Sequence, residues 1–289
     1  MTTPFGPAWS ASLRRASEAD LADWLAFARD VCDVADAIAL DAYRSDLEIA
    51  AKEDGSFVTQ ADRAIEHEIR TRLADRYPSH GVVGEEYGTE SGSAATRWYL
   101  DPIDGTHNFM RGMPLFGTLL AAEQDGETQV AVVSAPALGR RWFASRGHGA
   151  WVSGGPDPVP RRMEVSDRDD LGESQILFRS VTDMRASRVA AGFDGLLGSV
   201  WRERGFGDFW GYTHLADGSA EAMIERDLGP WDMAAPWLLV EEAGGSVTDF
   251  DGRRSYATGE SLATNGRLHT AVLDRLWERQ PSTPRAPAR

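Results

Sequence analysis

The chain has 289 residues, of which 42% are hydrophobic, so it can bury a sizeable core as one large domain or two small ones. Its 30 Lys and Arg residues against 45 Asp and Glu residues give a formal net charge of −15, the wrong sign for a protein that wraps nucleic-acid phosphates or lies on an anionic membrane. The composition favours a globular protein in which an anionic substrate would be bound with the help of metal ions or helix ends.

No membrane or secretory segment is indicated. No apolar run reaches the roughly 18 residues of a membrane span, and the first residues lack the apolar centre of a signal peptide. The single cysteine, Cys32, excludes an internal disulfide and suits a reducing compartment. We therefore expect a cytoplasmic protein. Small, turn-forming residues in 1–16 and prolines in 278–289 predict two flexible ends.

Helical and strand-like patterns alternate in the first part of the chain. Apolar residues recur at helical spacing over 17–43, which predicts a long amphipathic helix. A hairpin is expected over 49–59, with its turn at Asp54-Gly55. Thr59 and Asp62 are spaced as a helix-capping pair, and the second helix should end near Pro78.

Strands dominate the middle of the chain. Short strand-like runs at 80–88 and 96–104 both carry acidic residues near their ends, and β-rich runs over 115–152 predict an antiparallel meander. The Pro/Gly-rich stretch 153–162 is the best candidate for an internal boundary, which would separate an N-terminal α+β half (17–160) from a C-terminal α/β half (161–277).

The C-terminal half is expected to alternate again between strands and helices. Strands are predicted at 174–180, 200–207 and 220–225, and helices near 183–192, 208–217 and 231–243. Alternation of this kind favours a layered α/β or α+β architecture.

Acidic residues stand at four separate places where an apolar run ends or a helix starts: Asp62, Glu85-Glu86, Asp101 with Asp104, and Asp232. Open α/β sheets put ligand sites at such strand ends. If these carboxylates converge, they form an oxygen-rich cage that suits a hard cation such as magnesium.

The segment from Asp101 to Thr106 adds two further groups. Pro102 would fix the backbone so that the carbonyl of Ile103 could turn inward as another oxygen ligand. Gly105 and Thr106 would present backbone N–H groups at a helix start, which is an anion site. The segment thus predicts metal and phosphate binding side by side.

Each acidic residue also has a plainer interpretation. Asp62 and Asp232 could only cap their helices, and Glu85-Glu86 could be a solvated turn. Asp101 and Asp104 could form turns around Pro102. Because all of these acidic residues occur in one chain, the plainer interpretations explain the whole set less well than they explain each residue alone.

Four motifs, taken together, resemble the inositol monophosphatase-like family of metal-dependent phosphatases. They are "VTQAD" (58–62), "GEE" (84–86), "DPIDGT" (101–106) and "WDMAAPWLLVEEAGG" (231–245). The resemblance covers about residues 17–276. It implies a layered α-β-α-β-α sandwich of alternating helix and sheet layers, usually as a homodimer.

The resemblance also implies a magnesium-dependent phosphomonoesterase with two to three ions. A first ion would be bound by Glu85, Asp101 and the carbonyl of Ile103. A second would be bound by Asp101, Asp104 and Asp232, and a weaker third could lie near Glu85. Two-metal hydrolysis of this kind needs no covalent phosphoenzyme.

Catalytic roles follow from the same resemblance. Thr106 and Asp62 would orient and deprotonate the attacking water, and Lys52 would lie in the hairpin that approaches the metal site. Gly105 and Thr106 would contact the phosphate.

Within the family, the segments "VVSAPALGRRWFASRGHGAW" and "WRERGFGDFWGY" are most similar to the actinobacterial type of histidinol-phosphate phosphatase. Asp208 and Glu225 would then meet the cationic amino alcohol of L-histidinol phosphate, although Asp208 could instead cap a helix. His107 departs from the Lys or Thr expected after "DPIDGT". Alternatives are the same chemistry on inositol phosphate or sugar phosphates, or a non-catalytic metal-binding scaffold.

Overall fold

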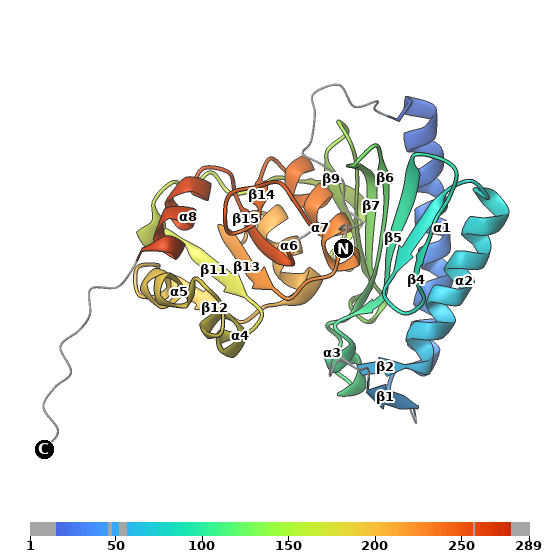
Figure 1. Cartoon of the computed structure of the whole chain (residues 1–289), viewed down its shortest axis with the longest axis horizontal. Coiled ribbons are helices and arrows are strands. Elements are labelled where there is room, and N and C mark those ends of the chain that lie inside the picture. The colour runs from blue at the N-terminus through green and yellow to red at the C-terminus, as the bar shows by residue number, and fades with distance from the viewer. Residues whose placement is uncertain (1–15, 46–47, 52–56, 257, 279–289) are drawn as a thin grey trace, which may run out of the picture.

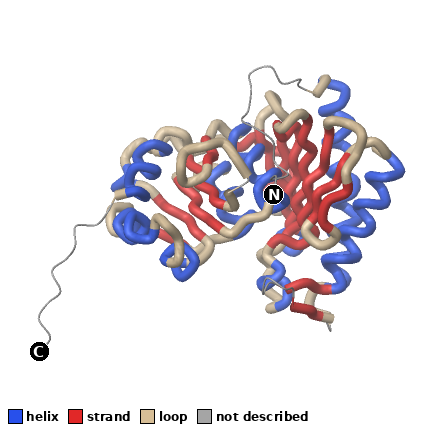
Figure 2. Tube along the Cα trace, viewed as in Figure 1, coloured by secondary structure: helices blue, strands red, loops and turns tan. Residues whose placement is uncertain are grey.

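The computed structural model describes residues 16–45, 48–51, 57–256 and 258–278. Nearly all of both predicted flexible ends, the Asp54-Gly55 turn and Lys52 lie outside the described residues. Figure 1 shows five layers that alternate between helices and sheets, and in Figure 2 helices flank the strands of both sheets. The predicted α-β-α-β-α sandwich is confirmed.

Two long helices form the first layer. The helix α1 (Glu18–Ala42) lies where the helix over 17–43 is predicted, and it begins at a capping box in which Ser17 and Asp20 satisfy each other's backbone N–H groups. The helix α2 (Gln60–Arg76) lies beside α1 on one face of the large sheet (Figure 1). Their apolar sides pack against that face, where Trp98 and Leu100 are fully buried.

The large sheet has eight strands in the order β10-β9-β8-β7-β6-β5-β3-β4. Their bounds are β3 (Gly81–Gly84), β4 (Gly88–Glu90), β5 (Thr96–Asp104), β6 (Gly117–Gln124), β7 (Glu127–Ala135), β8 (Arg140–Ser145), β9 (Ala150–Gly154) and β10 (Asp157–Met163). All neighbours are antiparallel except β3 and β5, so the predicted meander is confirmed. The Pro/Gly-rich stretch 153–162, the candidate internal boundary, forms the turn after β9 and most of β10. The sheet therefore continues through this stretch to Met163.

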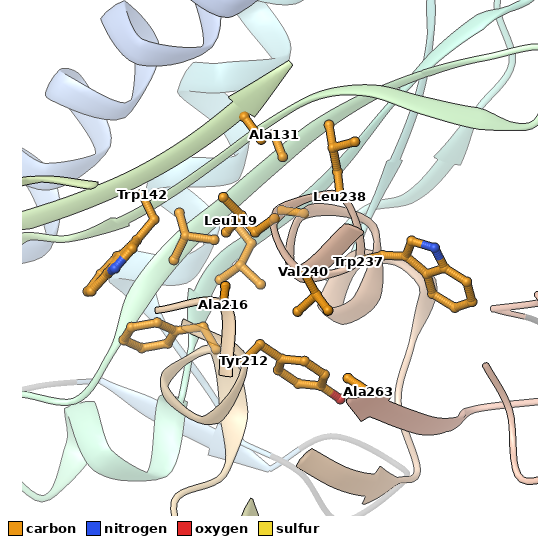
Figure 3. Close-up of a cluster of buried hydrophobic side chains, with 14 of the residues drawn as sticks. Leu119, Ala131, Trp142, Tyr212, Ala216, Trp237, Leu238, Val240 and Ala263 are labelled. Carbon is orange, nitrogen blue, oxygen red and sulfur yellow. The ribbon is translucent and has the colours of Figure 1, made fainter. Parts of the chain in front are cut away.

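The middle layer consists of α6 (Asp208–Ala216) and α7 (Pro230–Glu242). Figure 3 shows Trp237, Leu238 and Val240 of α7 among side chains from both sheets, including Leu119 and Ala131 on one side and Ala263 on the other. Because α7 is apolar on almost all sides, it is buried between the sheets instead of facing solvent.

The second sheet has the order β12-β11-β13-β15-β14. Its strands are β11 (Gln175–Phe178), β12 (Arg202–Arg204), β13 (Ala222–Arg226), β14 (Ser246–Thr248) and β15 (Glu260–Thr264). The strand β11 is parallel to both β12 and β13, whereas β15 is antiparallel to β13 and β14.

The outer layer contains α4 (Val181–Arg185), α5 (Ala190–Leu197) and α8 (His269–Trp277). The single helix expected near 183–192 is wrong, because α4 and α5 are separate. The hydroxyl of Ser187 donates to the carbonyl of Met184 and accepts from the N–H of Val189, which takes both backbone groups out of a continuous helix. Among the helices of the described residues, none has the length and apolar character of a membrane span.

Candidate active site

A cleft of about 580 Å³ brings together residues that are far apart in the sequence. Among the described residues, its lining contains nine of the predicted site residues: Glu85, Asp101, Ile103, Asp104, Gly105, Thr106, Asp208, Glu225 and Asp232. They come from the ends of β3, β5 and β13 and from the first turns of α3 (Thr106–Met110), α6 and α7. The structure therefore brings Glu85, Asp101, Asp104 and Asp232 together, whereas Asp62 and Glu86 are not part of the cleft lining.

A β-bulge puts the side chains of Asp101 and Asp104 on the same side of β5. Residues three apart in a regular strand point to opposite faces. Here Asp101 pairs with Leu119 and Asp104 with Gly117, so three steps on β5 match two on β6 and the extra residue reverses the alternation. The hydroxyl of Thr118 donates to the Pro102 carbonyl at 2.8 Å, which fixes the bulge.

The first turn of α7 brings Asp232 to the same point. One carboxylate oxygen from each of Asp101, Asp104 and Asp232 lies within 4.8 Å of the other two. Burial raises the pKa of Asp101 and of Asp104, and repulsion from neighbouring carboxylates raises them further. Burial, followed by repulsion from Glu85, raises the pKa of Asp232 to about 7.

These carboxylates fit a bound cation. The Oδ1 atom of Asp101 is buried and has no hydrogen-bond partner within the described part of the chain. Two buried acids and one half-buried acid, each offering a carboxylate oxygen, match the ligands that magnesium prefers. Glu85 follows β3, and its charge acts on both Asp101 and Asp232.

The two carboxylate oxygens of Asp62 have different surroundings. Its Oδ2 accepts from the N–H of Thr59 at 2.9 Å and from its hydroxyl at 2.5 Å, so the residue does cap α2. Its Oδ1 is buried without a partner among the described residues. Burial raises the pKa of Asp62 to about 6, and the nearby Glu85 also acts in this direction. The second oxygen is therefore free to accept a proton.

The predicted substrate residues Asp208 and Glu225 contact each other. The N–H of Asp208 donates to Oε1 of Glu225 at 3.2 Å, and the side chain of Asp208 does not cap α6. Oε2 of Glu225 is buried, with no hydrogen-bond partner among the described side chains and backbone groups. Burial and the charge of Asp208 raise the pKa of Glu225 to about 8.

Gly105 and Thr106 shape the start of α3. Gly105 has φ 81°, and a Cβ there would lie 2.8 Å from the carbonyl oxygen of Leu115, so glycine is required. The hydroxyl of Thr106 donates to the Ile103 carbonyl at 3.0 Å. His107 packs edge-on against Phe57 of β2 (Phe57–Thr59), at 5.3 Å between ring centroids, and so links α3 to the hairpin with β1 (Ile49–Ala51).

Sequence reasoning missed Arg179, which follows β11 and lines the cleft. Its Nε lies 3.7 Å from Oε1 of Glu225, and it is the one guanidinium among the described residues of the lining. The available signal was a cation near the end of the strand predicted at 174–180, in a chain whose other candidate site residues are mostly acids.

The chain is similar to known proteins of one phosphatase family. The model of the inositol monophosphatase family matches residues 20–281. The histidinol-phosphatase of Mycobacterium tuberculosis is 42% identical over 231 residues, which are 80% of this chain and 88% of the relative. The histidinol-phosphatase of Streptomyces coelicolor is 40% identical over 265 residues, with 90% of this chain and 99% of the relative covered.

Solved structures show the same fold. The extragenic suppressor protein SuhB of Bartonella henselae superimposes with a TM-score of 0.81 at 27% identity, over 89% of this chain and 99% of that one. Since the family match spans nearly all described residues and the acidic cluster fits the metal dependence of the family, the chain belongs to the inositol monophosphatase family of phosphoric monoester hydrolases.

Proposed function

We propose that the protein hydrolyses L-histidinol phosphate to L-histidinol and phosphate, as a step of histidine biosynthesis. Relatives named histidinol-phosphatases match at 40% and 42% identity over most of the chain. The single observation that carries the substrate assignment is Oε2 of Glu225, which is buried in the cleft beside Asp208 and accepts no hydrogen bond from any described residue. A carboxylate in this position needs a donor, and the ammonium group of histidinol would supply one.

Magnesium would be bound by the acids at the inner end of the cleft. Glu85, Asp101 and the Ile103 carbonyl would hold one ion, Asp101, Asp104 and Asp232 a second, and a third could lie near Glu85. When bound there, the ions would activate a water and neutralise charge on the phosphate and on the leaving oxygen.

The chain's own groups would direct the water and the phosphate. Oδ1 of Asp62 would accept the proton of the attacking water, because Oδ2 is already engaged by Thr59. Thr106 would orient that water, while backbone N–H groups of Gly105 and Thr106 would contact the phosphate. Lys52 is proposed to approach the site from the hairpin.

The test is a panel of phosphate esters assayed with magnesium. Histidinol phosphate should be the best substrate, and Asp208→Asn should weaken its kcat/KM about tenfold, since each decade corresponds to about 1.4 kcal/mol and a hydrogen bond to a charged group contributes roughly 1.5–3 kcal/mol. A neutral ester should be nearly unaffected. Asp227→Asn is a matched control, because it removes an exposed carboxylate that also lines the cleft.

Two outcomes would change the assignment. If wild-type protein hydrolyses inositol phosphate or a sugar phosphate faster, or Asp208→Asn slows both substrates equally, only the phosphatase assignment stands. If magnesium binds but no ester is hydrolysed, a non-catalytic scaffold is the better explanation.

We further propose a homodimer and a cytoplasmic location. The dimer is proposed because members of the family are usually homodimers, and analytical ultracentrifugation would test it. The location is supported by the single, fully buried Cys32, which needs no oxidising compartment.

A further inference from the structure

A buried acid on α2, outside the cleft lining, holds the loop that follows β3. Glu66 is fully buried, although it lies on a helix whose other acids and bases are mostly exposed. Its Oε2 accepts from the N–H of Glu86 at 2.8 Å, and its Oε1 accepts from the N–H of Tyr87 at 3.1 Å. One carboxylate therefore satisfies two successive backbone donors of the loop.

Arg70, one helical turn further along α2, completes this clamp. Its Nε donates to Oε1 of Glu66 at 2.8 Å, and its Nη2 donates to the carbonyl of Gly88. The guanidinium compensates the buried charge of Glu66 and adds a third attachment to the loop. The Glu66 carboxylate lies so close to the end of β3 that a Cβ at Gly84 would be 2.1 Å from its Oε1.

The clamp lies directly beside the predicted metal ligand Glu85. The N–H of Glu85 donates to the carbonyl of Leu100 in β5 at 3.2 Å, and the next N–H in the chain belongs to the Glu86 that Glu66 holds. Glu85 is therefore fixed on one side by the sheet and on the other by α2. The same helix carries Asp62 one turn before Glu66.

We propose that Glu66 is a positioning residue, which with Arg70 holds the loop 84–88 so that Glu85 is preorganised to bind magnesium. This inference rests on the proposed magnesium-dependent function. It also accounts for a fully buried carboxylate at a position that does not line the cleft. Groups that orient metal ligands in this way typically contribute about 10- to 100-fold to metal affinity or activity.

Glu66→Gln is the informative variant, because it keeps the size of the side chain. The amide oxygen can still serve Arg70 and Tyr87, but its NH2 group then faces the N–H of Glu86, and that bond is lost. Glu68→Gln is a matched control on the same helix. Glu68 also pairs with an arginine four residues on, at 2.7 Å, but its side chain is 36% exposed and does not bind the loop in the described structure.

The experiment titrates Mn²⁺ into substrate-free protein by electron paramagnetic resonance and measures the Mg²⁺ requirement of the reaction. Glu66→Gln should weaken Mn²⁺ binding and raise the Mg²⁺ concentration for half-maximal activity about tenfold or more, with turnover at saturating Mg²⁺ close to wild type. Glu68→Gln should match wild type in both measurements. A purely structural Glu66 would lower the melting temperature in EDTA without changing either metal measurement.

Equal Mn²⁺ affinity in Glu66→Gln and Glu68→Gln would overturn the proposal, even if Glu66→Gln is less stable. If Glu66→Gln does not fold, Mn²⁺ binding is measured on Arg70→Gln instead. This variant loses the hydrogen bond to the Gly88 carbonyl and should also bind Mn²⁺ more weakly than wild type. Wild-type affinity in folded Arg70→Gln would then refute the role. If wild-type protein itself binds no Mn²⁺, the proposed function fails and this inference fails with it.

Discussion

The substitution Asp101→Asn should stabilise the metal-free protein and abolish its response to magnesium. Coulomb's law gives about 3.5 kcal/mol for two unit charges 4.8 Å apart at an effective dielectric constant of about 20. Partial protonation relieves much of this repulsion, so we expect a gain of about 1–3 kcal/mol in the free energy of unfolding. Asp101 is the best position for the change, because its Oδ1 accepts no hydrogen bond within the described chain.

Thermal unfolding measured in EDTA and in excess Mg²⁺ tests this reasoning. In EDTA the melting temperature of Asp101→Asn should exceed that of wild type, at about 2–4 °C for each kcal/mol. Excess Mg²⁺ should raise the melting temperature of the wild type, because the ion binds only the folded protein, whereas the melting temperature of the variant should hardly change. Glu68→Gln controls for the change in total charge. A variant that is no more stable than wild type in EDTA, or that gains as much from Mg²⁺, would refute the account of mutual repulsion.

Three further outcomes are expected. Asp62→Asn should lower kcat about 10²- to 10⁴-fold in a phosphate-release assay while Mn²⁺ titration shows retained binding; collapse of metal binding would instead make it a ligand. Burial raises the pKa of Glu241, but Arg146 and Arg254 lower it overall, so its stabilising contribution is present above about pH 4.3 and is lost as the pH falls through the folded-state value. Urea unfolding should accordingly show Glu241→Gln less stable than wild type at pH 7 and similar to it at low pH; a difference independent of pH contradicts this. Gly192→Ala places a Cβ 2.0 Å from a carbonyl oxygen of α8, so chemical unfolding should show a loss of about 1–3 kcal/mol with unchanged Mn²⁺ affinity.

Local signals in the sequence were sufficient for the helices with strong caps. The capping pair at Thr59 placed the start of α2 within a residue, and the helical spacing of apolar residues from position 17 did the same for α1, because both signals depend only on neighbouring residues. The region 153–162 was harder, since its prolines and glycines resemble a linker. The pairing of β10 with β9 depends on tertiary contacts that the local pattern does not contain.

The acidic cluster was predictable as a set, but its geometry was not. In a regular strand Asp101 and Asp104 would diverge, and the bulge that brings them together depends on how β5 pairs with β6. Glu66 could not be recognised for a similar reason. In the sequence, Glu66 with Arg70 has the same spacing as Glu68 with Arg72, and only the folded loop makes one pair buried and the other exposed.

The position of the cleft between the two sheets has a consequence for biosynthesis. Asp101 and Asp104 leave the ribosome long before Asp232, at chain growth of about 5–20 residues per second. For several seconds the nascent chain therefore contains Asp101 and Asp104 without Asp232. Asp232 reaches its place only when α7 packs between the two sheets. A cation that needs all three carboxylates, Asp101, Asp104 and Asp232, can therefore bind only after α7 has folded into place.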